Sequence, residues 1–110
     1  MMRLAMSQAG SGLLRALVRR AGIPRDRILL TNWHSTDWQS LTFTGERHEL
    51  TLRIAGPGSH EAATRLSDGI EDAEIPIPGY VVADIALRGH PKMEDDGSVL
   101  IEFEALTVAD

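Results

Sequence analysis

The sequence predicts an α+β domain of two layers, in which two helices cover one face of an antiparallel sheet. Two segments place apolar residues at the three- and four-residue spacing of a buried helical stripe. The other apolar segments mostly alternate with polar residues, as strands with one buried face do. With 110 residues the chain has the size of one domain, and the expected order of elements is α-β-β-β-α-β-β.

The first expected element is a helix near the N-terminus. We expect residues 1–12 to form a flexible segment and residues 13–110 to form a single domain. Ser11 is the expected cap of a helix over residues 12–21, and Gly22 followed by Pro24 is typical of a helix end. The apolar stripe of this helix consists of Leu13, Leu14, Leu17, Val18 and Ala21.

Three strands are expected next. Residues 28–33 are apolar on both faces, which is typical of an inner strand. Alternating residues on either side of Gly45-Glu46 predict a hairpin over residues 40–54 with a type II′ turn, placing Phe43 opposite His48. Residues 33–38 would then form the turn between the first two strands.

A second helix is expected from Ser59 to about Asp72, with Gly69 as its weak point. Pro76 and Pro78 restrict residues 74–79 to an edge or an extended connection. The resulting order is also the order of a circularly permuted ferredoxin-like fold, an analogy that implies no function. The buried stripe of the second helix consists of Ala62, Ala63, Leu66, Ile70 and Ala73.

The last part of the chain predicts a second hairpin, with strands over residues 80–88 and 98–108 and a loop through Asp95-Asp96-Gly97. The expected inner residues are Val81, Ala83, Ile85, Leu87, Val99, Ile101 and Phe103. The outer face is too apolar for a surface that meets only water, so we expect a symmetric homodimer to cover it. The residues expected to form the interface are Tyr80, Val82, Leu100, Leu106 and Val108.

Composition limits the environment and the partners. The absence of cysteine excludes disulfides and thiolate sites, and no apolar run is long enough to span a membrane, so we expect a cytoplasmic protein without a membrane partner. Residues 1–27 hold six arginines and one acidic residue, whereas residues 28–110 hold five basic and fifteen acidic residues. This acidic bulk disfavours nucleic-acid binding, which remains a weaker alternative through Arg15, Arg19 and Arg20.

The strongest candidate site consists of Trp33, His34, Asp37 and Trp38. This segment contains both tryptophans of the chain, and two indoles beside a histidine and a carboxylate suit a small ligand. The alternative is a simple turn in which Ser35 or Asp37 binds backbone N–H groups. The four histidines match no metal-ligand spacing, and the sequence implies no cofactor.

An enzyme is the alternative class of function. Asp84, Glu102 and Glu104 belong to the outer face of the second hairpin, and pairing of Leu87 with Val99 would place Asp84 opposite Glu102. Such a pair could bind a divalent metal or act in acid–base chemistry, as could His34 with Asp37. Arg53 or Arg88 could instead neutralise the carboxylates. We therefore expect a non-enzymatic, self-associating domain and assign no catalytic residue.

Overall fold

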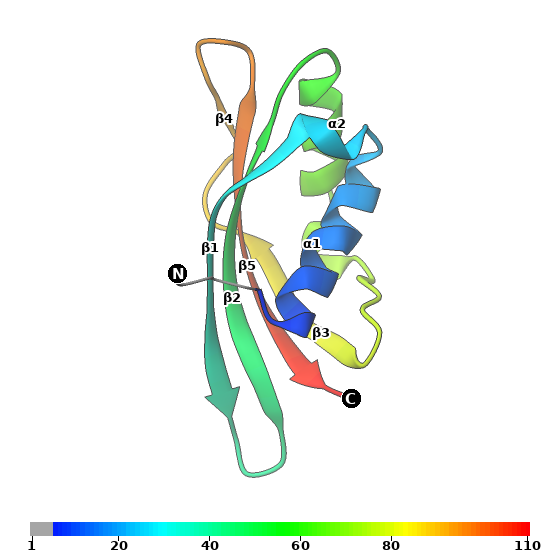
Figure 1. Cartoon of the computed structure of the whole chain (residues 1–110), viewed down its shortest axis with the longest axis vertical. Helices are drawn as coiled ribbons and strands as arrows, with labels where there is room; N and C mark the ends of the chain where they lie inside the picture. The colour runs from blue at the N-terminus through cyan, green and yellow to red at the C-terminus, as the bar shows by residue number, and fades with distance from the viewer. Residues whose placement is uncertain (1–5) are drawn as a thin grey trace, which may run out of the picture.

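The computed structural model describes residues 6–110 and confirms the α+β class, with both helices on one face of an antiparallel sheet (Figure 1). The sheet has the order β1-β2-β5-β3, and the short strand β4 pairs with β5. In chain order the elements are α1 (Gln8–Ala21), β1 (Ile28–Gln39), β2 (Thr44–Ile54), α2 (Ser59–Ser67), β3 (Tyr80–Leu87), β4 (Lys92–Met93) and β5 (Val99–Ala109), with single 3-10 turns at Arg25–Arg27 and Ile70–Asp72.

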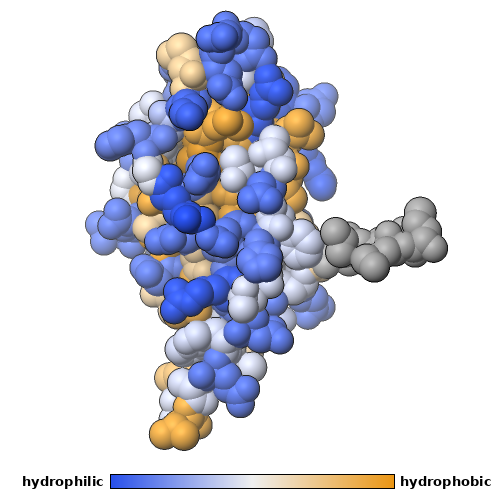
Figure 2. All heavy atoms as spheres, turned by 90° about the vertical axis from the view of Figure 1, so that its left-hand side faces the viewer, coloured by the Kyte–Doolittle hydropathy of each residue, from blue (hydrophilic) through white to orange (hydrophobic). Residues whose placement is uncertain are grey.

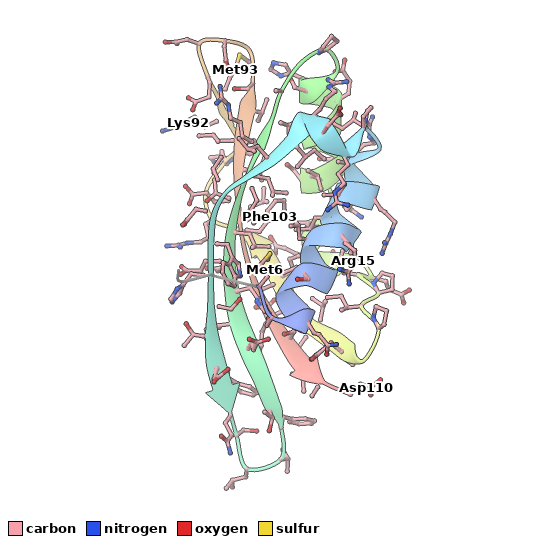
Figure 3. The ribbon with its side chains drawn as sticks, viewed as in Figure 1. Met6, Arg15, Lys92, Met93, Phe103 and Asp110 are labelled. Atoms are coloured by element: carbon pink, nitrogen blue, oxygen red, sulfur yellow. The ribbon has the colours of Figure 1, made fainter. Side chains whose placement is uncertain are left out.

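The core lies between the sheet and the helices, where Figure 3 places Phe103. Alternate residues of β2 and β5 face this space, so that Leu50 lies opposite Phe103 and Leu52 opposite Ile101. The predicted stripe of α2 is confirmed by its burial, although the helix ends at Ser67 and Gly69 adopts a left-handed φ of 65°. The buried members of that stripe are Ala62, Ala63, Leu66 and Ile70.

Helix α1 begins four residues earlier than predicted. Ser7, rather than Ser11, caps it, because the Ser7 Oγ accepts a hydrogen bond of 3.1 Å from the Gly10 backbone N–H. Residues 8–12 are therefore helical instead of flexible, and Gly12 packs directly against Ile77. The small residues of this first turn make a poor isolated helix, but they allow close packing. The part of the predicted flexible segment that comprises residues 1–5 lies outside the described residues.

The first hairpin is longer than predicted, with two long strands before α2 where three shorter ones were expected. The predicted turn at Gly45-Glu46 is wrong, since the turn lies at residues 40–43 and Gly45 is part of β2, opposite Trp38. A Cβ at Gly45 would lie 2.1 Å from the Thr107 carbonyl oxygen, so glycine permits close strand contact here. Residues 33–38 are correspondingly strand, not turn.

The register of the second hairpin differs because of a bulge at Ala83, between the pairs Val82–Thr107 and Asp84–Leu106. Leu87 lies opposite Phe103 instead of Val99, whose partner is Met93 of β4. Because of this extra residue, the side chains before the bulge in β3 lie on the opposite faces of the sheet from those predicted.

Gly12 provides a test of the packing between α1 and Ile77. We expect Gly12→Ala to lower the free energy of unfolding by about 1–3 kcal/mol, because overpacking destabilises a close-packed site. The new Cβ would lie 2.4 Å from the Ile77 Cγ2 atom. At an open helix position the same change stabilises by about 1 kcal/mol. Denaturant unfolding measures the difference.

The control is the same substitution in an Ile77→Ala background, which lacks the Cγ2 atom. There Gly12→Ala should no longer destabilise the protein. An equal loss in both backgrounds would show that the contact with Ile77 does not explain the glycine.

Candidate functional site

A chain of hydrogen bonds on the helix-side face of the sheet is half-buried at Trp33 and Ser35 and fully buried at His48 and Thr107. The Trp33 indole N–H donates to the Ser35 Oγ at 3.0 Å, and that oxygen lies 2.7 Å from the His48 Nδ1. The His48 Nε2 lies 2.8 Å from the Thr107 Oγ1. Since these residues come from β1, β2 and β5, the chain links three adjacent strands.

His48 is 1% exposed, and burial lowers the pKa of its imidazole, with a smaller opposing effect from Glu46. A neutral ring satisfies every contact if Ser35 donates to Nδ1 and the Nε2–H donates to Thr107. Both ring nitrogens and the Trp33 N–H are then occupied by protein groups. This arrangement fixes three strands together and leaves Ser35 without the exposed, activated hydroxyl of a nucleophile.

The structure places residues 33–38, the predicted ligand site, in strand β1 and not in a turn. Because this segment is a strand, its side chains alternate between the two faces of the sheet. Trp33 and Asp37 share the helix-side face with Leu50 and Glu46, their partners on β2, whereas His34 and Trp38 lie on the outer face. The two indoles therefore cannot enclose one ligand, and His34 cannot act with Asp37.

The carboxylates of the alternative enzyme site lie on the outer face. Asp84 is opposite Leu106, so the predicted opposition to Glu102 is wrong. Arg88 forms ion pairs with Glu49 and, at 3.7 Å, with Glu104, as expected for a solvated charged face. Asp84 and Glu104 line a hollow of about 210 Å³, and residues 6–110 contain no group of three His, Asp or Glu residues suited to a metal ion.

The structure divides the five predicted interface residues between the two faces of the sheet. Tyr80 and Val82 pack against the core, because the bulge at Ala83 reverses the predicted alternation. Leu100, Leu106 and Val108 lie half-buried on the outer face. Figure 2 views this face and shows its hydrophobic patches separated by hydrophilic side chains.

A groove of about 1040 Å³ lies between α1 and β1, and sequence reasoning missed it. Leu14 and Val18, predicted to be buried, are only half-buried and face the groove. The prediction that residues 28–33 form an inner strand is wrong, because β1 is an edge strand of the sheet. The apolar residues on both faces of this segment are the sequence signal that could have indicated the groove. The lining residues are Met6, Ser11, Leu14, Arg15, Val18, Arg19, Pro24, Arg25, Asp26, Ile28 and Leu30.

The edge of this groove is basic. Arg15 and Arg19 are four residues apart and therefore share one side of α1. Arg20 points elsewhere, since its Nη2 donates to the Asp68 carbonyl oxygen at 2.7 Å. The three arginines of the alternative nucleic-acid contact thus do not form one surface.

The end of the first hairpin projects beyond the body of the domain (Figure 1). We call residues 37–46 the hairpin arm. Leu41 is 105% exposed and Phe43 is 56% exposed. Asp37 lies directly opposite Glu46 on the helix-side face, and neither forms an ion pair within the described residues. The arm therefore combines an exposed apolar tip with two like charges.

No known protein family matches this chain, and no curated protein matches it either. Within residues 6–110, none of the helices has the length and apolar character needed to cross a membrane. The candidate surfaces are therefore defined by geometry and charge alone.

The lowered pKa of His48 predicts that stability depends on pH. The folded ring stays neutral at pH values where the unfolded ring, with a pKa of about 6.5, already binds a proton. The contribution of His48 is complete above about pH 6.5 and is lost as the pH falls towards the folded-state pKa. We expect the free energy of unfolding to decrease between about pH 7 and 5, as measured by denaturant titration.

His48→Gln removes the titrating ring and should flatten the decrease, at a cost of about 1–3 kcal/mol at pH 8. His90→Gln is the matched control, because His90 is exposed. The hypothesis fails if His48→Gln retains the wild-type pH slope while remaining folded.

Proposed function

We propose that this domain is a non-enzymatic binding module that forms a symmetric homodimer through the free edge of β1. The observation that carries the proposal is the position of β1 at the end of the sheet order. Within residues 6–110, no strand pairs with the side of β1 that faces away from β2. A 12-residue strand with an open edge is a template for pairing with another strand.

The sequence of β1 supports this use of the edge. Proteins protect open edges with lysine, proline, bulges or covering segments. Strand β1 contains no lysine, arginine or proline, and its single bulge at Thr31 lies near one end. The stretch from Asn32 to Gln39 is regular and exposes its edge.

The opposite edge of the sheet, formed by β3, is better protected against pairing with another strand than the edge formed by β1. Strand β3 has 8 residues and a central bulge. The chain before it packs against this strand through the turn Ile70–Asp72, and Ile77 forms a bridge to Tyr80. Pairing through β3 is therefore disfavoured.

The outer face supports a dimer less well than the β1 edge does. Its centre carries charged side chains, whereas the centre of a stable interface is depleted of charge. Leu106 and Val108 form only one part of that face. The charged residues between the apolar positions are Arg47, Glu49, Arg88, Glu102 and Glu104.

The other parts of the proposal follow from chemistry and composition. The Ser35 hydroxyl is held between Trp33 and His48, and the carboxylates of the outer face are solvent-exposed or paired with Arg88. These features favour binding over catalysis. We propose the cytoplasm as the compartment, with which a chain without cysteine is compatible.

Thr36→Lys on β1 tests the proposed edge. Sedimentation at micromolar concentration is expected to give a wild-type mass of twice 12.0 kDa. The lysine appears in both copies beside the contact, so the dissociation constant should rise at least about tenfold. Thr51→Lys is the matched control, because Thr51 lies on the same face of the inner strand β2.

The control variant should dimerise like the wild type. A wild-type monomer of 12.0 kDa would contradict the proposal. Loss of the dimer in Thr51→Lys but not in Thr36→Lys would also contradict it, since the outer face would then be the contact.

A further inference from the structure

We propose that each hairpin arm of the dimer lies in the α1–β1 groove of the other copy. This inference rests on the proposed function, because it requires that the two β1 edges pair. It assigns one occupant to the groove, a second copy of this chain. Three features carry it: the direction of β1, the apolar tip of the arm and the charges at both sites.

The direction of β1 places the arm beside the groove. Two copies of one strand that pair antiparallel are related by a two-fold axis perpendicular to the sheet. This axis keeps the helices of both copies on the same side. It also brings the Gln39 end of β1 in one copy beside the Ile28 end in the other. Since Ile28 and Leu30 line the groove, the arm reaches the partner's groove without a change of fold.

The apolar tip of the arm matches the apolar floor of the groove. Leu41 and Phe43 are exposed to water in the single chain. The groove is lined by Leu14, Val18 and Leu30 and is large enough for two such side chains. Burial of exposed apolar surface from both copies would favour the association.

The charges of the arm and the groove are opposite in sign. Asp37 and Glu46 lie directly opposite each other on the helix-side face, and opposed like charges are unfavourable unless a cation neutralises them. The groove supplies Arg15, Arg19 and Arg25, against the single acidic residue Asp26. Figure 3 shows Arg15 on α1 and Met6 just before it, both of which line the groove. The helix-side face of the arm would meet these arginines in the dimer.

A charge exchange between two variants tests this contact. The groove variant carries Arg15→Glu and Arg19→Glu, and the arm variant carries Asp37→Lys and Glu46→Lys. In a homodimer of either variant, both arm–groove contacts bring like charges together, so the dissociation constant should rise at least about tenfold. A mixture of both forms one contact between two reversed surfaces and one between two wild-type surfaces. The mixed dimer should therefore regain close to wild-type affinity.

The matched control is Glu61→Lys with Glu71→Lys, which makes the same change in charge as the arm variant. Both residues are exposed and lie outside the groove. This variant should dimerise like the wild type and should not rescue the groove variant. Rescue by the control would overturn the inference, because it would show a non-specific effect of net charge.

Leu41→Ser with Phe43→Ser tests the apolar tip separately. These side chains are exposed in the single chain, so far-UV circular dichroism of the dilute monomer should remain unchanged while dimerisation weakens at least about tenfold. If arm and groove variants dimerise like the wild type, while Thr36→Lys still dissociates the dimer, this inference fails and the proposed function stands. A monomeric wild type would remove both.

Discussion

The antiparallel pairing of β2 with β5 is the constraint on which the rest of the structure depends. These are the two inner strands of the sheet, and their register runs without interruption from the pair Gly45–Val108 to the pair Ile54–Val99. A shift by one residue would turn the apolar side chains outward and the charged ones into the core. The helices, β1 and β3 all take their positions from this register.

The hydrogen-bonded chain through His48 extends this constraint to a third strand. A buried imidazole is tolerated because both ring nitrogens have partners, Ser35 on β1 and Thr107 on β5. Strand β1 is thus positioned by directional bonds as well as by apolar contact. A neutral histidine inside the protein is a structural group here, and its pH sensitivity follows from its position in the core.

The unequal lengths of strands and helices explain the surfaces that are available for binding. Strand β1, with 12 residues at about 3.3 Å each, is longer than α1, with 14 residues at about 1.5 Å each. The helical layer therefore cannot cover the whole sheet. The uncovered parts are the groove beside α1 at one end of β1 and the projecting arm at the other. An edge that pairs with a second copy would use both.

The sequence by itself determined the two-layer α+β class, the buried stripe of α2 and the inner face of β5, since each follows from the periodicity of one segment. Only the tertiary structure decided three other features. These are the start of α1 before residue 12, where Gly12 packs against Ile77, the position of Gly45 within a strand, and the bulge at Ala83. Because the turn lies at residues 40–43, residues 33–38 form a strand, and the side chains of the predicted ligand site lie on two opposite faces of the sheet. A turn, a bulge or a groove depends on how closely a second segment approaches, and periodicity along one segment carries no information about that distance.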